Sequence, residues 1–562
     1  MNLLQPNKNT KLSFFCLTII SGIIILYPYT HFNLLISQGD HGHNLYSFYQ
    51  TSLGKLPFKD YWYPYGPLMP FYYAIFLNIF GASIKAVLLG KTLCIGMAGL
   101  FVFLGLSLFI SPLLSFIASL WYWTFCPDFF YNFNHTGAYT FNMALLYFLF
   151  SYIKTGRRQF IYCGYVCNLF TFLVKINFGL FSLFAFMASL LLIYYRKNTL
   201  KNISFYAFPL LAIPLSVALL CWPLMAGLPQ YAVSQCFSYF NAYFYQVSIL
   251  YTLQRLFIYF FEMAVSSWPN FIFTSLVFIS SVSLCHSLVV NRFEKGVKNN
   301  LLLILATLAL FTILNLHEFF GDSREFMFLY KLNMMVPFQI ILSFVLIHYG
   351  LYFLNDKLKL ATYFITFMIL FRTIDAGHRM ISYVESSGHY LSLRRGQIHA
   401  TNEREWFSTV ERTVSYLESH LNEDELFFAL PYEPLYYFLV GRPSPTWQVM
   451  TIEATGIPPA QEAEIIRDLD SKNVNYIVLS NRSYSLEDGV GILGQTYLPG
   501  LYGYILKNFE EVASYGNWDA VAGWNVGHAV KILKRKTVSP VVLPSDASSQ
   551  NTIQRGEHAA HR

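Results

Sequence analysis

Long apolar runs separated by short basic clusters recur from Lys11 to about residue 374, and they limit the fold more than any other feature. The chain of 562 residues is 55% hydrophobic and 12% charged, whereas soluble domains carry roughly 25% charged residues. Runs of this length are typical of membrane-spanning helices. The sequence therefore predicts a polytopic α-helical membrane protein over residues 1–375, followed by a smaller water-soluble part.

The apolar runs predict about eleven spans. We expect them near residues 13–29, 67–81, 92–110, 140–153, 160–174, 178–195, 203–225, 268–290, 301–316, 334–351 and 359–374. Segment 111–126 is read as a buried or surface-lying helix rather than a crossing, because a crossing would invert the sidedness of every later loop.

Basic residues gather in the short loops between these spans, as is typical of cytoplasmic loops. The clusters are Lys8 and Lys11, Lys85 and Lys91, Lys154 with Arg157 and Arg158, Arg196 with Lys197 and Lys201, Arg292 with Lys295 and Lys298, and Lys357 with Lys359. All fall on one side of the predicted membrane. The N-terminus is then cytoplasmic and the C-terminal domain extracytoplasmic, in what we interpret as a bacterial inner membrane. Because the net charge of +7 is dispersed over these loops, it does not indicate a nucleic-acid partner.

Residues 376–536 are expected to form an extracytoplasmic α/β domain. Helix-like segments at 402–421, 433–441 and 461–473 alternate with strand-like segments at 425–431, 475–480 and 528–535. The tail 537–562 lacks apolar periodicity and is predicted to be disordered.

The loop over residues 30–66 is long enough for structure of its own. Apolar side chains at Leu45, Phe48, Tyr49 and Leu53 recur at helical spacing, which predicts an interfacial helix lying flat on the membrane. The aromatic residues at the return into the membrane, among them Tyr63, are typical of the membrane–water interface. Together with segment 111–139, this loop is the expected catalytic region.

Charged side chains at membrane rims are candidates for function, because burying them in hydrocarbon is costly. The candidates expected at the outer face are Asp40, Asp128, His135, Lys175, Arg324, Lys331 and Arg372. Structural alternatives remain open: Asp40 as a helix cap, Asp128 in a plain turn, and Lys175 reaching back to the interface.

The first outer loop, from Asp40 through LYSFYQTSLGKLPFKDYWYPYGPL, resembles that of the GT-C superfamily of membrane glycosyltransferases. Members carry an Asp just after the first span, followed by G-x-x-P-aromatic-x-D and a P-x-G-P-L return. The Lys175/Gly179 hinge and the segment PYEPLYYFLVGRPSP resemble bacterial relatives of protein O-mannosyltransferases and of the lipid A aminoarabinose transferase.

The resemblance implies an inverting glycosyltransferase that moves a sugar from a polyprenyl-phosphate donor to a hydroxyl of a lipid, glycan or protein acceptor. Asp40 would be the catalytic carboxylate that deprotonates this hydroxyl. Cations among Lys175, Arg324, Lys331 and Arg372 would stabilise the leaving phosphate, with His135, Tyr63 and Asp128 also binding substrate.

The sequence departs from the family pattern at two places. His41 follows Asp40 where members related to protein mannosyltransferases carry a second acidic residue, and segment 111–139 has no Asp-x-Asp pair. A divalent metal on Asp40 and Asp128 therefore stays an open alternative. Other open readings are an oligosaccharide ligase, and a non-enzymatic lipid or glycan transporter or polysaccharide-binding membrane protein. The glycines at 489, 491 and 494 match a dinucleotide fingerprint only formally, since no strand directly precedes them.

Overall fold

The computed structural model describes most of the helical region and nearly all of the C-terminal domain. The residues described are 8–33, 38–129, 132–197, 203–238, 251, 254–255, 258, 268–290, 292–315, 336–351, 360, 363, 366, 390–400, 405–484, 489–522 and 527–536. The expected boundary at 375 and the expected disordered tail from 537 lie outside them.

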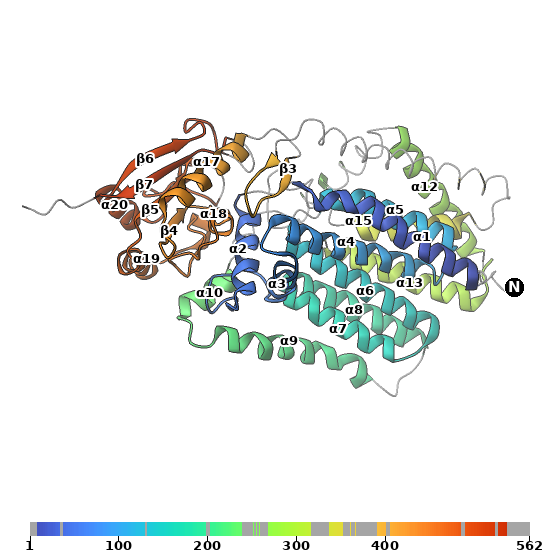
Figure 1. The fold of residues 1–562 in the computed structure, drawn as a ribbon. Coiled ribbons are helices and arrows are strands. Elements are labelled where there is room, and N and C mark those ends of the chain that lie inside the picture. Colours follow the sequence, from blue (N-terminus) through green and yellow to red (C-terminus); the bar gives the residue numbers. More distant parts are fainter. Residues whose placement is uncertain are drawn as a thin grey trace, which may run out of the picture.

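Long apolar helices pack side by side into an elongated bundle, with the C-terminal domain at one end (Figure 1). The helices of this part are α1 (Lys8–Leu26), α2 (Asp40–Ser52), α3 (Leu68–Phe80), α4 (Ile84–Leu106), α5 (Pro112–Phe129), α6 (Phe133–Thr155), α7 (Gln159–Val174), α8 (Ile176–Lys197), α9 (Ile203–Met225), α10 (Gln230–Ser238), α12 (Trp268–Val289), α13 (Lys295–Asn315) and α15 (Val336–Gly350). Five helices of the described chain are long and apolar enough to cross a membrane: α1, α4, α8, α9 and α13.

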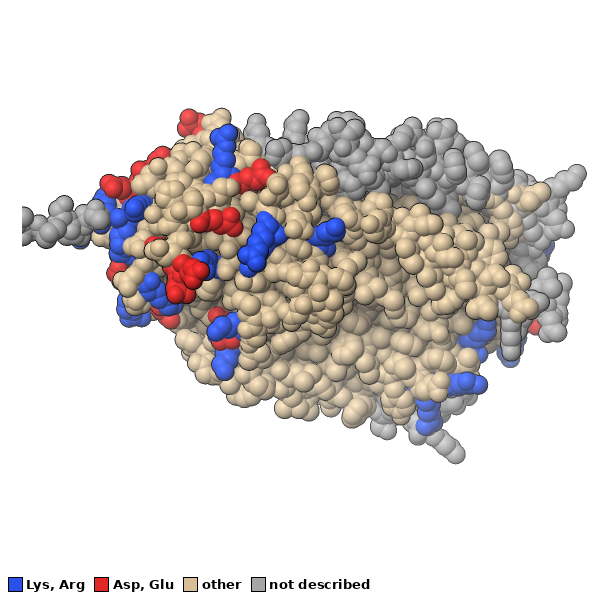
Figure 2. Space-filling model, in the orientation of Figure 1, with Lys and Arg blue, Asp and Glu red and all other residues tan. Residues whose placement is uncertain are grey.

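Charged side chains are distributed along the bundle as a membrane protein requires. On the face shown in Figure 2, they gather on the C-terminal domain and, as Lys and Arg, at the far end of the bundle, with a broad uncharged band between. The end next to the C-terminal domain is called the domain end below. At the far end, the ammonium of Lys11 donates to the carbonyl of Ser107 at 3.0 Å, and that of Lys154 donates to the carbonyl of Leu108.

Helix α3 does not cross the bundle, contrary to the span expected at 67–81. Its 13 residues span about 20 Å, which is shorter than a hydrocarbon core of about 30 Å. Both its flanks lie at the domain end, since the Gly66 amide bonds the carbonyl of Val174, and the Ile84 amide bonds that of Arg395. The cluster at Lys85 therefore lies at the domain end, not with the other basic clusters.

Helix α5 corrects the second expectation about the spans. Segment 111–126 was expected to be buried or to lie flat; α5 is largely buried, but it runs lengthwise in the bundle, packed against α1, α4 and α15 (Figure 1). One expected crossing is thus missing and one lengthwise helix is added, so α6 still begins at the domain end, where Asn134 bonds Asn44 of α2.

The C-terminal domain is a mixed four-stranded sheet covered by helices. Its strands are β4 (Phe427–Leu430), β5 (Tyr476–Ser480), β6 (Phe509–Tyr515) and β7 (Val530–Arg535), in the order β4-β5-β7-β6. Only β4 and β5 are parallel. The helices are α17 (Glu405–His420), α18 (Leu435–Val440), α19 (Pro459–Ser471) and α20 (Pro499–Asn508). The predicted helices and strands are present here, with α20 and β6 in addition.

Helix α2 lies between the bundle and the C-terminal domain, in contact with α3 on one side and α18 on the other (Figure 1). Every residue from His41 to Thr51 is buried, so protein encloses the helix that the spacing predicts. Tyr61, Trp62 and Tyr63 are likewise packed inside rather than forming an interfacial belt. Nearby, β1 (Phe32–Asn33) pairs with β3 (Ile398–Ala400), which also pairs with β2 (Tyr390–Leu391).

Candidate active site

Asp40 occupies the first turn of α2 at the boundary between bundle and domain. The N-cap of this helix is Gly39, so Asp40 is the first helical residue rather than the cap considered from the sequence. A carboxylate there is favoured by the positive end of the helix dipole. Its side chain is half-buried, and Oδ1 accepts a hydrogen bond from the hydroxyl of Tyr432 in the C-terminal domain.

A chain of buried polar side chains connects Tyr63 with the backbone of Asp40. The Tyr63 hydroxyl donates to Oδ1 of Asn134 at 2.9 Å, and Nδ2 of Asn134 donates to Oδ1 of Asn44 at 3.0 Å. Asn44 in turn donates to the carbonyl oxygen of Asp40 at 2.8 Å. All three side chains are fully buried. Since buried polar groups are retained only where they are hydrogen-bonded, this chain fixes the start of α2 against the start of α6.

The next residue of α6, His135, contacts Lys175. The Lys175 ammonium donates to Nε2 of His135 at 2.8 Å and lies 4.8 Å from the ring centroid of Phe178. Both Lys175 and His135 are buried. Lys175 lies between α7 and α8 with extended backbone, so its side chain is carried on a break between two helices. The structure thus brings together two of the predicted residues that lie 40 positions apart.

A second buried lysine lies beside the first turn of α6. The ammonium of Lys91, on α4, is 5.6 Å from the ring centroid of Phe133, the first residue of α6. Lys91 and Lys175 are both buried, and the helix N-terminus itself carries partial positive charge. This arrangement is therefore suited to a phosphate or another anion.

The histidines next to Asp40 have packing roles in this structure. His43 donates from Nε2 to the carbonyl of Trp62 at 3.1 Å, and burial lowers the pKa of His43 to about 4, so its imidazole is neutral at pH 7. The ring of His41 packs edge-on against Phe133, with centroids 5.4 Å apart. Neither is arranged as a metal ligand.

The remaining predicted site residues are not described. The backbone of Asp128 belongs to α5, but its side chain lies outside the described residues, as do Arg324, Lys331 and Arg372 altogether. Among the residues described, no three His, Cys, Asp or Glu side chains come together in a group that could hold a metal ion. Oδ1 of Asp40 is engaged by Tyr432, and no step below uses a metal.

Sequence reasoning missed Lys91, Asn44 and Tyr432 as site residues. Lys91 was placed in a cytoplasmic loop because the span was begun at residue 92, whereas α4 begins at Ile84. A lysine two turns inside an apolar helix is by itself a signal of function. For Tyr432 the signal was the segment PYEPLYY, which resembles GT-C relatives but to which the sequence analysis assigns no role.

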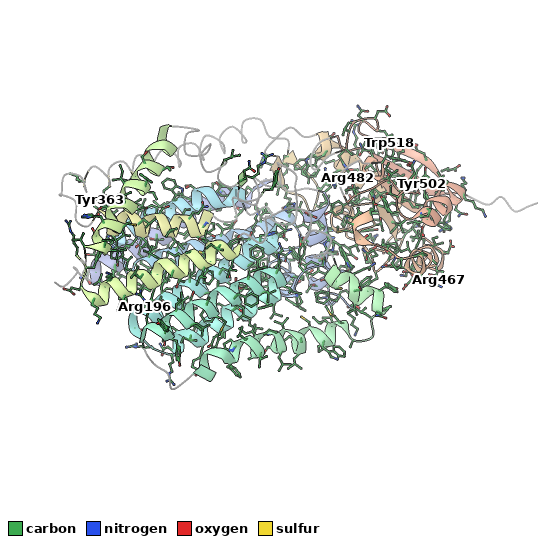
Figure 3. All side chains as sticks on the ribbon, turned by 180° about the vertical axis from the view of Figure 1, so that it is seen from behind. Arg196, Tyr363, Arg467, Arg482, Tyr502 and Trp518 are labelled. Carbon is green, nitrogen blue, oxygen red and sulfur yellow. The ribbon has the colours of Figure 1, made fainter. Side chains whose placement is uncertain are left out.

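The C-terminal domain contacts the loop before α3 through several further bonds. The indole of Trp447 donates to the carbonyl of Phe58 at 2.7 Å, and the amide of Trp62 donates to the carbonyl of Trp447 at 2.9 Å. The amide of Ser444 donates to the Tyr46 hydroxyl at 3.1 Å. These bonds hold the domain over the residues around Asp40. Figure 3 shows Arg482, discussed below, on the side of the domain nearest the bundle.

No family model and no curated protein sequence matches the chain. Several solved structures do match the chain. ArnT from Cupriavidus metallidurans in the apo state superposes with a TM-score of 0.52 at 11% identity, over 93% of this chain and 97% of ArnT. The chain has the fold of the GT-C glycosyltransferases. At this identity the likeness establishes the fold, and it confirms the resemblance that loop one suggested.

Two further GT-C structures align over most of this chain. The oligosaccharyltransferase AglB from Archaeoglobus fulgidus, in complex with an inhibitory peptide and a dolichol-phosphate, gives a TM-score of 0.47 at 12% identity, over 88% of this chain and 72% of AglB. The arabinofuranosyltransferase AftD from Mycobacteria gives 0.46 at 12% identity, over 93% of this chain and 40% of AftD.

Proposed function

We propose that this GT-C protein transfers a sugar, with inversion, from a polyprenyl-phosphate donor to a hydroxyl of a lipid, glycan or protein acceptor. The observation on which the proposal depends is the pair of buried lysines beside the first turn of α6, a turn whose Asn134 is hydrogen-bonded through Asn44 to the backbone of Asp40. We infer that these cations form an anion site at the same end of the bundle as the Asp40 carboxylate. We infer that this end faces the extracytoplasmic side.

In the proposed reaction the acceptor oxygen attacks the anomeric carbon of the donor as the bond from that carbon to the phosphate oxygen breaks. The acceptor proton passes to the carboxylate of Asp40. The electron pair of the broken bond stays with the polyprenyl phosphate, whose charge Lys175, Lys91 and the start of α6 stabilise in a site shielded from water. His135 orients the Lys175 ammonium through their hydrogen bond.

An apolar cavity supports a lipid-linked donor. It has a volume of about 390 Å³ and lies between α3, α4, α6 and α7, with Met69, Gly137 and Phe141 among its lining residues. Gly137 is only two residues beyond His135 on α6. An isoprenoid tail in this cavity would place its phosphate near Lys175. The cavity's apolar lining favours hydrocarbon over sugar.

The proposal is tested by replacing Asp40 in cells. Asp40→Asn keeps the size of the side chain and removes its basicity, so we expect turnover to fall on the order of 10²–10⁴-fold. Mass spectrometry of membrane lipids and surface glycans should show a polyprenyl-phosphate sugar accumulating and one glycan decoration lost.

The matched control is Asp60→Asn in the same loop. The exposed Asp60 carboxylate accepts only a local bond from the Leu56 amide at 2.7 Å, and an asparagine oxygen can replace it. Normal lipids and glycans in the Asp40→Asn strain, at equal protein level, would refute the transferase and favour a transporter or polysaccharide-binding protein.

A further inference from the structure

The segment Tyr432–Leu435 of the C-terminal domain packs directly onto the first turn of α2. The Tyr432 hydroxyl bonds Oδ1 of Asp40, and the Tyr432 ring covers Gly39 so closely that a Cβ there would clash with it. One turn on, a Cβ at Gly42 would lie 2.7 Å from the backbone nitrogen of Leu435. The contact with Asp40 therefore belongs to a close backbone approach of two elements, not to a single flexible side chain.

Tyr432 is itself held from inside the domain. The guanidinium of Arg482 lies 4.7 Å from the ring centroid of Tyr432, and Arg482 is 1% exposed. A cation placed over a tyrosine ring is attracted to it, and more strongly where water is excluded. The ring is thus fixed on one face by Arg482 and packed against Gly39.

Arg482 belongs to a buried group of ionisable side chains for which the proposed reaction has no use. Glu433 and His528 are 0% and 3% exposed, and their Oε2 and Nε2 atoms are 3.9 Å apart. The Tyr436 hydroxyl lies 2.9 Å from the same nitrogen of His528. Burying such groups costs stability, so we expect these side chains to serve a function other than stabilising the fold. Tyr432 connects this buried group to the site.

We propose that Tyr432 is a positioning residue for Asp40, supplied by the C-terminal domain and held in place by Arg482. With Oδ1 engaged by the Tyr432 hydroxyl, rotation of the carboxylate is restricted and its orientation toward the acceptor is set. This inference depends on the proposed function, because it concerns the use that the reaction makes of Asp40. It gives the C-terminal domain a part in catalysis that does not require it to bind substrate.

Tyr432→Phe removes the hydroxyl and keeps the ring that packs on Gly39 and Arg482. Its matched control is Tyr437→Phe in the same part of the domain. Tyr437 is also fully buried, and its hydroxyl accepts a bond from the Ala429 amide at 2.8 Å, with no bond to Asp40. Any effect of losing one buried hydroxyl from this region appears in both variants.

The first readout needs no substrate. The full-length protein in detergent is treated with a carbodiimide and glycine ethyl ester, and the labelling rates of Asp40 and Asp60 are measured by peptide mass spectrometry. We expect Asp40 in Tyr432→Phe to react at least about threefold faster than in wild type, with Asp60 unchanged and Tyr437→Phe like wild type. Equal Asp40 rates in wild type and Tyr432→Phe would overturn the inference, whatever the activity.

The second readout uses as donor the polyprenyl-phosphate sugar extracted from Asp40→Asn cells. We expect kcat of Tyr432→Phe to fall roughly tenfold or more, the usual effect of losing a hydrogen bond to a charged group, with KM within about twofold. A raised KM with unchanged kcat would contradict positioning. If no such lipid accumulates, the proposed function fails, and the labelling rates still decide whether Tyr432 holds Asp40.

Discussion

At the scale of single residues, Lys91 and Lys175 are the clearest sign that this part of the bundle binds something. Both lysines are buried, and a buried ammonium loses its hydration. An anionic ligand would recover part of that cost, because charge-assisted hydrogen bonds are about twice as strong as neutral ones.

We therefore expect Lys175→Met or Lys91→Met to weaken binding of a polyprenyl phosphate by roughly tenfold or more each, while leaving the melting temperature unchanged or raised. Binding can be measured by fluorescence titration of the detergent-solubilised protein. The exposed Lys55→Met, in the loop after α2, is the control. Unaltered binding in both buried variants would place the phosphate elsewhere.

Glu433 makes a second prediction at this scale, on the pH dependence of stability. Burial raises the pKa of Glu433 to about 7, against the opposing effect of Arg482. The pKa of Glu433 in the folded state lies above the unfolded value of 4.5. Its contribution to the stability of the fold is therefore complete below pH 4.5 and is lost as pH rises through 7. Burial lowers the pKa of His528 to about 3, so its contribution is lost as pH falls below 6.5.

The difference in unfolding free energy between wild type and a Glu433 variant separates the effect of Glu433 from that of His528. We expect the stability of wild type relative to Glu433→Gln to fall by up to about 3 kcal/mol between pH 4.5 and 8. Melting curves at each pH measure it, with the exposed Glu423→Gln as control. A difference between wild type and Glu433→Gln that does not change with pH would mean that Glu433 keeps one protonation state throughout.

At the scale of elements, the contact between α2 and α18 depends on the absence of side chains on α2. Leu435, at the start of α18, lies against Gly42 so closely that an added methyl group must push the two elements apart. Gly42→Ala should destabilise the protein by about 1–3 kcal/mol, the usual cost of overpacking, and should weaken catalysis by moving Tyr432 away from Asp40.

The control is Gly503→Ala in helix α20, where an added Cβ meets nothing within 4 Å. There alanine should be neutral or slightly stabilising, because it lowers the entropy of the unfolded chain. Thermal unfolding and donor turnover measure both variants. Wild-type behaviour of Gly42→Ala in both assays would show that the α2–α18 contact is loose.

At the scale of the whole molecule, the two ends of the bundle predict a sidedness that differs from the sequence expectation at one position. Lys85 is the second residue of α4 and lies at the domain end, next to Ile84, whose amide bonds the carbonyl of Arg395. Arg157 lies at the far end, close to Thr155, the last residue of α6. In a cysteine-free background, an impermeant maleimide should label Lys85→Cys from the same side as Asp519→Cys in the C-terminal domain.

Arg157→Cys should be labelled only from the opposite side. All three positions are exposed, so reactivity reports sidedness rather than burial. Labelling of Lys85→Cys together with Arg157→Cys would restore the topology expected from the basic clusters and contradict the placement of α3 at the domain end.

The sequence predicted the class of fold and the alternating C-terminal elements, and its assignment of Asp40, His135, Lys175 and Tyr63 to the site stays a prediction. It did so because apolar runs, basic loops and the loop-one motif are local signals. It could not show that α3 is too short to cross or that α5 packs lengthwise, since hydropathy alone does not distinguish a buried helix from a crossing one. The contact between Tyr432 and Asp40 could not be predicted for another reason: the two residues lie 392 positions apart in the sequence.

That separation has a consequence for how the protein is made. Asp40 leaves the ribosome long before Tyr432, and at about 5–20 residues per second the interval between them is roughly 20–80 s. Throughout that time the face of α2 that α18 later covers has no partner from its own chain. The newborn membrane region is therefore expected to depend on chaperones or on the insertion machinery, and a transcript truncated before codon 432 would yield a membrane protein with α2 left uncovered.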